Sequence, residues 1–196
     1  KVVWIGRMST SPYLLGVSAK SDIKTVADIK KLGRPLKIAS VGFGTTVYTA
    51  ASIAKSVIGF DTAMITGYKG TRNIILGVVR GDADAAIAPT QSFGSFIRSG
   101  DMRGVVTFEE KSSYPGVQTI TEAGYPQLTG LGVERLIGAP PGLPADIQKI
   151  LSDAVAKAIQ DPDSAAWAKK TKRPFAYLPA GKTQAAVDRA LKNLSD

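Results

Sequence analysis

The sequence predicts an α/β fold with a mostly parallel sheet flanked by helices. Between residues 36 and 108, short apolar runs alternate with amphipathic stretches, which is the pattern of successive strand–helix units. Glycine or proline marks most of the changes from one type to the other. The composition agrees with a folded chain, because 44% of the 196 residues are hydrophobic and 21% are charged.

Strands are expected where short apolar runs are bounded by turn residues. Near the start of the chain, the polar segment Ser9-Thr10-Ser11-Pro12 predicts a turn between two such runs. The expected strands are residues 2–8, 13–19, 36–40, 62–66, 83–88, 103–108 and 132–138.

Helices are expected where apolar residues recur at helical spacing between residues that favour helix ends. Thr25 and Thr183 are expected N-caps, and Gly59 is expected to end a helix in the left-handed conformation. Pro144 and Pro162 suit the first turns of two further helices. The expected helices are residues 26–32, 47–58, 71–80 and 91–98, followed by three after residues 144, 161 and 183.

Single residues outside these patterns have ordinary structural explanations. Trp4 and Trp167 are expected to pack in the core, because large aromatic side chains are usually mostly buried. Asp82 and Asp84 flank a strand and are expected to face solvent. No pair of carboxylates has an arrangement suited to glycoside chemistry.

Missing residue types exclude several kinds of site. The chain has no His, which removes imidazole-based triads and most zinc sites, and no Cys, which removes thiol nucleophiles and disulfides. The net charge is +9, but the Lys and Arg residues are scattered, and nucleic acid is therefore not an expected partner. The one dense basic run, at residues 169–173, follows a predicted helix, where cations complement the helix dipole.

The ends of the chain and its longest apolar runs indicate whether it spans a membrane or carries a targeting segment. No apolar run approaches the roughly 20 residues needed to cross a bilayer, so the chain is not expected to span a membrane. The chain opens on a strand-like run without an initiating Met or a signal peptide, and we expect further sequence upstream.

The clearest candidate site is a glycine-rich loop between a predicted strand and a predicted helix. It reads Gly42-Phe43-Gly44-Thr45-Thr46, directly after the strand that ends at Ser40. Small residues allow a ligand to approach the backbone, and the first N–H groups of a helix favour an anion. A tight turn with a threonine cap explains the same residues equally well. The loop matches neither the dinucleotide fingerprint nor the phosphate-binding loop.

Two further loops follow predicted strands in the same way. They are Gly67-Tyr68-Lys69-Gly70, with a phenol and an ammonium group, and Ala88-Pro89-Thr90. For Lys69 alone, a solvent-facing turn is the preferred interpretation. Ligands of open α/β sheets bind beyond the carboxyl ends of strands, so three such loops predict one site at a shared edge.

The motifs in this order resemble the solute-binding receptors of tripartite tricarboxylate transporters, also called Bug receptors. The resemblance covers nearly the whole chain. It rests on Thr25-Val26-Ala27-Asp28-Ile29, Gly42-Phe43-Gly44-Thr45, Gly67-Tyr68-Lys69-Gly70-Thr71 and residues 76–84, 114–126, 138–144 and 156–162.

The resemblance implies a two-lobed, type II periplasmic-binding-protein-like fold that closes on a small organic carboxylate. It implies a periplasmic or extracytoplasmic location, membrane permease components as partners, and neither catalysis, metal nor cofactor. The ligand would lie between the lobes, held by strand-to-helix loops. The residues that match this pattern, or lie in its loops, are Thr10, Ser11, Ser40, Gly42, Phe43, Gly44, Thr45, Tyr68, Lys69, Gly70 and Thr90.

The sequence departs from the family pattern in two respects. The N-terminal part of the first lobe has no counterpart, so residues 12–130 would form a complete second lobe, and residues 1–11 and 131–196 a partial first lobe. The apolar helix faces of the partial lobe would then be uncovered, unless an upstream segment, a second chain or a rearrangement covers them. Ala88-Pro89-Thr90 also stands where many members have an Asp-Asn pair, which leaves the ligand's identity open.

Two other classes of function remain as alternatives. The same two-lobed architecture occurs in effector-sensing domains of transcription regulators, which would need a helix-turn-helix module upstream. An α/β enzyme would have only Ser/Lys or carboxylate chemistry, and the Gly-x-Ser-x-Gly motif is missing.

Overall fold

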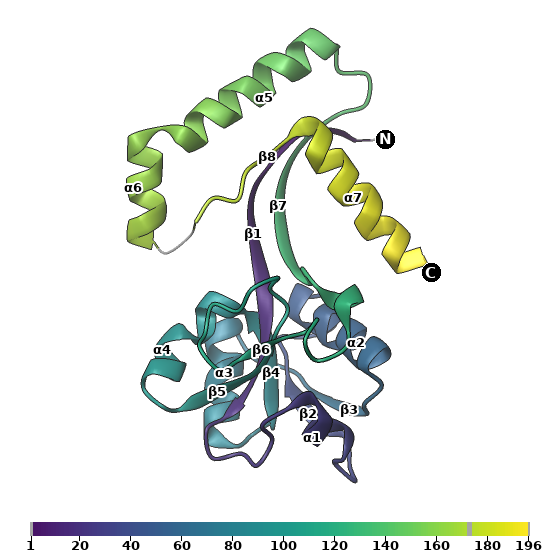
Figure 1. The fold of residues 1–196 in the computed structure, drawn as a ribbon, viewed down its shortest axis with the longest axis vertical. Coiled ribbons are helices and arrows are strands. Elements are labelled where there is room, and N and C mark those ends of the chain that lie inside the picture. The colour runs from purple at the N-terminus through teal and green to yellow at the C-terminus, as the bar shows by residue number, and fades with distance from the viewer. Residues whose placement is uncertain (1, 172–173, 196) are drawn as a thin grey trace. The chain divides into compact units, whose positions relative to one another are not determined.

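The computed structural model describes residues 2–171 and 174–195, which form two compact units. Unit 1 contains Lys1–Thr10 and Glu134–Asp196, and unit 2 contains Ser11–Val133. Strand β1 (Val3–Ser18) contributes residues to both units (Figure 1). The α/β class expected from the sequence is confirmed.

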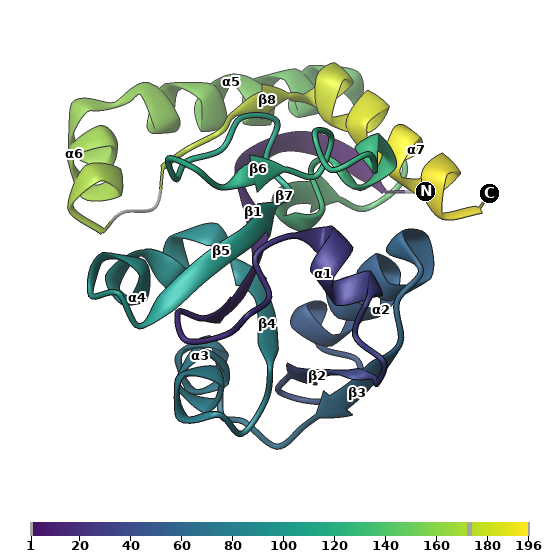
Figure 2. The ribbon, with the colours of Figure 1, turned by 60° about the horizontal axis from the view of Figure 1, so that its bottom comes forward.

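Unit 2 contains the larger sheet, whose strand order is β3-β2-β4-β1-β5-β6. Strands β2, β3 and β4 are parallel, whereas β1 runs antiparallel to both β4 and β5. Helices α2 and α3 lie on opposite sides of β4 (Figure 2). The strands are β2 (Leu36–Ala39), β3 (Thr62–Ile65), β4 (Ala85–Pro89), β5 (Met102–Thr107) and β6 (Gln118–Thr119). The helices are α1 (Val26–Lys30), α2 (Thr46–Ile58), α3 (Thr71–Arg80) and α4 (Gly94–Arg98), with short 3-10 turns η1 (Thr90–Phe93) and η2 (Pro126–Leu128).

The turn predicted at residues 9–12 was wrong, because β1 continues through it as a single strand of 16 residues. Proline fixes its own φ near the extended range and has no N–H to pair, so an extended strand can accommodate Pro12. The Pro12 carbonyl accepts a hydrogen bond from the Thr90 hydroxyl at 3.0 Å. The polar composition of the segment therefore reflects side-chain contacts rather than a reversal of the chain.

Helix α2 shows how the sequence pattern produces the core of unit 2. The apolar residues of its predicted face are all buried, and Ile53 and Val57 beside that face are partly buried. The buried residues are Val47, Ala50, Ala51, Ala54 and Ile58. Gly59 ends the helix with φ 77° and ψ 52°, the left-handed conformation that glycine adopts without a Cβ penalty. At α1, the hydroxyl of Thr25 and the carboxylate of Asp28 form a reciprocal capping box.

Unit 1 has much less interior. Its elements are the first part of β1, β7 (Gly132–Ala139, which begins in unit 2), α5 (Ala145–Gln160), α6 (Pro162–Thr171), β8 (Leu178–Pro179) and α7 (Ala180–Ser195). Among its described hydrophobic residues, only Ile5 and Ala168 are buried. The apolar stripe of α5 is exposed, with Ile150 61% and Leu151 41% accessible. Within the described residues, no helix has the length and apolarity that a membrane crossing requires.

Several expectations for unit 1 were wrong. Trp167 is 48% exposed and stacks on Phe175 at 6.3 Å between ring centroids, because α6 has little core to enter. Helix α7 begins at Ala180, so Thr183 lies in its first turn, and its buried hydroxyl donates to the Leu178 carbonyl. Lys169 and Lys170 do lie in the last turn of α6, whereas residues 172–173 of the basic run fall outside the described residues.

Asp84 does not face solvent freely, in contrast to the sequence expectation. Its carboxylate accepts hydrogen bonds from both terminal nitrogens of Arg34, at 2.6 and 3.0 Å, and from the Lys37 N–H at 2.9 Å. Partial burial opposes ionisation of Asp84, but the hydrogen bonds from Arg34 and Lys37 outweigh it, so the pKa lies below its ordinary value. This carboxylate therefore joins the loop before β2 to the start of β4.

The lowered pKa of Asp84 predicts an acid-dependent part of the stability. A carboxylate with a depressed folded-state pKa stabilises the fold above its unfolded pKa of about 3.9, and this stabilisation is lost as the pH falls through the folded value. We expect Asp84→Asn to lower the unfolding free energy by about 1 kcal/mol at pH 7. The difference in unfolding free energy between pH 7 and pH 3 should therefore be smaller in the variant than in the wild type. Urea unfolding at both pH values measures this.

Asp82→Asn is the matched control for Asp84→Asn. Asp82 pairs with Arg80 at 2.8 Å, but both side chains are about half exposed, at 44% and 58%. Its loss is expected to change the unfolding free energy by less than about 0.5 kcal/mol. Equal losses in the two variants would contradict a structural role specific to Asp84.

Candidate functional site

The carboxyl ends of β2, β3 and β4 lie at one edge of the sheet in unit 2, because these strands are parallel neighbours. The antiparallel register pairs Tyr13 of β1 with Pro89 of β4, which brings Ser11 and Pro12 to the same edge. The residues that follow each strand therefore converge there, as the sequence predicted from the strand–helix alternation.

Ser40 lies at this edge immediately after β2, and its side chain is fully buried at 0% exposure. Its N–H donates to the Ile65 carbonyl at 2.8 Å, which joins the ends of β2 and β3. The hydroxyl, in contrast, has no hydrogen-bond partner among the described residues. A buried polar group without a partner carries the full cost of its lost hydration, so this hydroxyl calls for an explanation.

Thr45 is the N-cap of α2 by position, but its side chain does not cap the helix. Its hydroxyl instead donates to the Gly42 carbonyl at 2.7 Å and closes the glycine loop upon itself. The first N–H groups of α2 therefore receive no acceptor from the Thr45 side chain. The sequence allowed a turn in which a threonine side chain caps α2, and this cap does not form.

The tip of the glycine loop is open to its surroundings. Gly44 has φ +78°, and a Cβ built on it would meet no atom within 4 Å. Phe43 is 90% exposed and packs edge-on against Tyr48, with 5.5 Å between the ring centroids. An exposed aromatic ring beside a helix N-terminus without a side-chain cap combines an apolar contact surface with anion-binding donors.

The second half of the edge is formed by β1 and the residues after β4. Ser11 and Thr90 are each 4% exposed, and the Gln91 side-chain amide donates to the Ser11 hydroxyl at 3.0 Å. Sequence reasoning missed Gln91, although its position directly after Thr90 places it in the third strand-to-helix loop. Thr10, the other residue expected here, belongs to unit 1.

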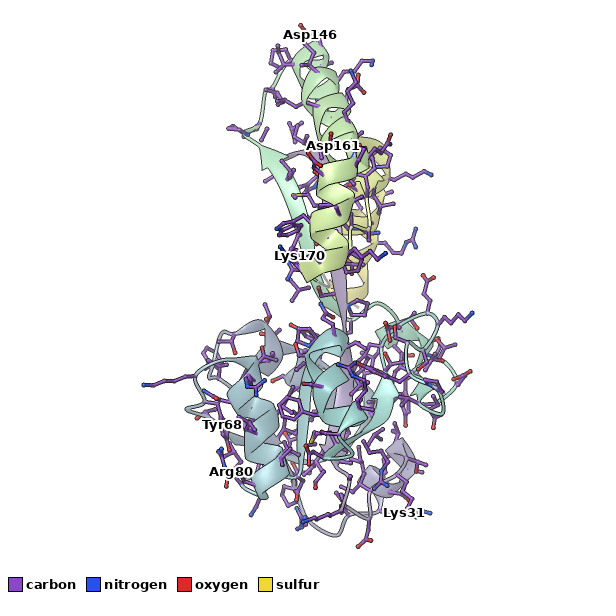
Figure 3. The ribbon with its side chains drawn as sticks, turned by 90° about the vertical axis from the view of Figure 1, so that its left-hand side faces the viewer. Lys31, Tyr68, Arg80, Asp146, Asp161 and Lys170 are labelled. Carbon is purple, nitrogen blue, oxygen red and sulfur yellow. The ribbon has the colours of Figure 1, made fainter. Side chains whose placement is uncertain are left out.

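The loop Gly67-Tyr68-Lys69-Gly70 contributes less than its composition suggested. The Tyr68 ring packs against α3, where a Cβ on Gly77 would come within 2.6 Å of it, and Figure 3 shows Tyr68 alongside this helix. Burial, with a smaller contribution from Asp82, raises the pKa of the Tyr68 hydroxyl. The Lys69 side chain is exposed, and Gly70 precedes α3 as its N-cap residue with φ 93°.

Comparison with known proteins gives a family match over most of the chain. Residues 2–183 match the model of the tripartite tricarboxylate transporter family receptor. Among curated protein sequences, no match is found.

Solved structures share the fold at low sequence identity. A TctC solute-binding protein from Polaromonas, without ligand, has a TM-score of 0.83 and 19% identity over 96% of this chain and 66% of its own. An R. palustris protein with adipate has a TM-score of 0.71 and 18% identity, covering 99% of this chain and 66% of its own. MatC from Rhodopseudomonas palustris with bound malate has a TM-score of 0.62 and 23% identity, covering 84% and 57%. The chain thus spans at most about two thirds of the length of these relatives, as the missing part of one lobe had predicted.

Proposed function

Because the chain belongs to the family of tripartite tricarboxylate transporter receptors, we propose that it is an extracytoplasmic receptor for a small organic carboxylate. In this proposal, unit 2 is the complete second lobe, and its glycine loop holds the carboxylate. The membrane permease components of the transporter then take the solute from the receptor.

The unpaired hydroxyl of Ser40 is the observation that carries the proposal. It is buried beside a loop whose helix lacks a side-chain cap, so hydrogen-bond donors are present there without protein acceptors. A carboxylate accepts several hydrogen bonds and is stabilised by the dipole at a helix N-terminus. The same ligand therefore accounts for the free hydroxyl, the uncapped helix and the open glycine loop.

The neighbouring residues would orient the rest of the ligand. Gln91 and Ser11 form a hydrogen-bonded pair at the same edge and offer polar contacts for a second group of the ligand. Phe43 offers an aromatic face for the ligand's carbon chain. The relatives solved with adipate and with malate support dicarboxylates as the first compounds to test.

A thermal-shift screen with mono-, di- and tricarboxylates at fixed ionic strength tests the proposed function. A ligand at 100 times its Kd adds about 2.7 kcal/mol to the unfolding free energy, which raises Tm by several degrees. The bound acid is expected to be recovered unchanged, because a chain with no His and no Cys lacks the usual nucleophile–base pairs. Equal small shifts with every acid, or none with any, would contradict a specific receptor.

Ser40→Ala tests the assignment of the site, because its two expected effects have different signs. The variant should bind the selected acid about tenfold more weakly, since one hydrogen bond to a charged group is lost. Without ligand it should be as stable as the wild type or slightly more stable, because an unpaired buried hydroxyl is removed. Isothermal titration and urea unfolding measure the two effects.

Ser52→Ala is the matched control for Ser40→Ala. The Ser52 hydroxyl donates to the Tyr48 carbonyl within α2, away from the strand end. Its removal should leave the affinity unchanged. Wild-type affinity in Ser40→Ala, or the same loss in both variants, would remove Ser40 from the site.

A further inference from the structure

Unit 2 has a groove of about 420 Å³ apart from the glycine loop. It lies between the end of α4, the first residues of β5 and the loop at residues 114–117. Its lining contains two cationic residues, Lys24 and Arg103, and no carboxylate. The carboxylate-binding loop proposed above shares no lining residue with it.

The Arg103 end of the groove lies at the opposite edge of the sheet from the glycine loop. In β1, Tyr13 pairs with Pro89 at the carboxyl end of β4, whereas Val17 pairs with Ala85 and Arg103 at the beginnings of β4 and β5. Four residues of extended strand, or roughly 13 Å, therefore separate the end of β4 at Pro89 from the beginning of β5 at Arg103. A ligand in the groove would not occupy the proposed solute site.

One wall of the groove is a tight turn that the sequence motif Tyr114-Pro115-Gly116-Val117 encodes. The Val117 N–H donates to the Tyr114 carbonyl at 3.2 Å, and Gly116 has φ +78°, which is the arrangement of a type II turn. The Tyr114 hydroxyl donates to the Thr90 carbonyl at 3.0 Å and fixes the ring beside the groove. The wall is therefore held in place without a ligand.

The floor of the groove is apolar and closely packed. A Cβ on Gly104 would come within 2.8 Å of a Val117 methyl group and 3.2 Å of Leu14, so only glycine fits between these side chains. Met102 and Ile97 add further apolar surface. An apolar lining with a few fixed polar groups is typical of small-molecule sites.

The guanidinium of Arg103 provides the polar group. One of its terminal nitrogens donates to the Ser21 and Ile23 carbonyls, which holds the side chain in place. Its Nε is buried without a hydrogen-bond partner, and no carboxylate of the described residues forms an ion pair with it. The carboxylate of Glu109 is engaged by the Thr107 and Ser113 hydroxyls at 2.8 and 2.6 Å. A part-buried cation without a counter-charge favours an anion from outside.

Lys24 adds a second positive charge at the rim. Its backbone N–H donates to the Asp28 carboxylate at 3.0 Å, which fixes the segment before α1, while its side chain is exposed. We propose that this groove binds a carboxylate with a short apolar body, through Arg103 and Lys24, as a site separate from the solute site. The apolar body contacts Met102, Val117 and the Tyr114 ring.

Titration of the ¹⁵N-labelled chain with sodium benzoate, followed by NMR, tests the groove. Saturable shifts are expected for the backbone amides of Gly104 and Gly116, against sodium chloride at matched ionic strength. Arg103→Gln should weaken binding at least about tenfold, and Lys24→Glu about fivefold or more. Lys20→Glu makes the same charge change on the same segment outside the groove and should leave the affinity within about twofold.

The Lys24 variant keeps the test decisive if Arg103→Gln does not fold. Absence of saturable shifts at the groove, or unchanged affinity in Lys24→Glu, would overturn the proposal. Gly44→Val should leave benzoate binding in the groove unchanged, so failure of the solute site and failure of the groove are distinguishable.

The source of the carboxylate is settled by a second probe. An N-acetyl-aspartyl-leucine amide presents the same group as part of a peptide. Tighter binding of this peptide than of benzoate would assign the groove to an acidic residue of a protein partner, and the reverse order would assign it to a free organic acid. Binding of neither compound would contradict the carboxylate assignment.

Discussion

Gly44→Val is expected to lower the affinity for the bound carboxylate by about 100-fold or more, while the chain still folds. The physical reason is the position of the new side chain rather than a clash within the protein. A Cβ at residue 44 would meet no atom within 4 Å. In the proposed site it would project into the space that the carboxylate needs. Losing two or more charge-assisted hydrogen bonds to backbone N–H groups accounts for a loss of this size.

The same substitution also strains the backbone, and this effect has to be separated from binding. Gly44 has φ +78°, where a β-branched residue costs about 1–2 kcal/mol. Either the loop retains its shape at this cost, or it moves out of the left-handed conformation and the N–H groups turn away from the ligand. Both outcomes weaken binding, so a variant with equal strain elsewhere is needed.

Gly100→Val supplies that comparison. Gly100 has φ +77°, and a Cβ on it would also meet nothing within 4 Å, but it precedes β5 at the opposite edge of the sheet. We expect both variants to lose a similar unfolding free energy and only Gly44→Val to lose affinity in isothermal titration. If Gly44→Val binds normally, or Gly100→Val loses as much affinity, the glycine loop is not the carboxylate site.

Local signals in the sequence were sufficient for most elements of unit 2. The glycines that end α2 and α3 act through their own backbone conformations, so the ends of these helices can be predicted without the rest of the fold. Gly59 and Gly81 both adopt the left-handed conformation that ends these helices. The strand-to-helix loops likewise follow from the order of strands and helices alone.

The errors arose where distant contacts override the local signal. The segment around Pro12 has the composition of a turn, but its carbonyl accepts a hydrogen bond from Thr90, which is 78 residues away. Tyr68 belongs to a candidate loop, but its ring packs against Gly77 of α3, where the missing Cβ leaves room for it. Neither contact can be predicted from the residues next to it in the sequence.

The candidate site was predictable in position more than in detail. The glycine loop and Thr90 could be assigned from their places after strands, because parallel strands end at a common edge. The burial of Ser40 and the pairing of Gln91 with Ser11 depend on the register of β1 against β4, which the sequence does not specify. The same holds for Arg103, which is an ordinary basic residue in the sequence; the fold partly buries it without a carboxylate partner among the described residues.

Gly132→Ala is expected to destabilise unit 2 by about 2–4 kcal/mol, a large effect for one added methyl group. Gly132 begins β7, and a Cβ on it would lie 2.7 Å from the Pro12 Cα, 2.9 Å from the Ser11 carbonyl carbon and closer still to the Ser11 oxygen. All three atoms belong to the backbone, so no side-chain rotation relieves the clash. Strand β1 must move instead, and with it the residues that pair with Thr90 and Gln91.

Urea unfolding of Gly132→Ala beside Gly33→Ala measures this effect. A Cβ on Gly33 would meet nothing within 4 Å, so that variant should change the unfolding free energy by less than about 0.5 kcal/mol. Because Ser11 carries part of the proposed site, Gly132→Ala should also weaken carboxylate binding under conditions where it remains folded. Equal unfolding free energies of the two variants would contradict the close approach of β7 to β1 at Gly132.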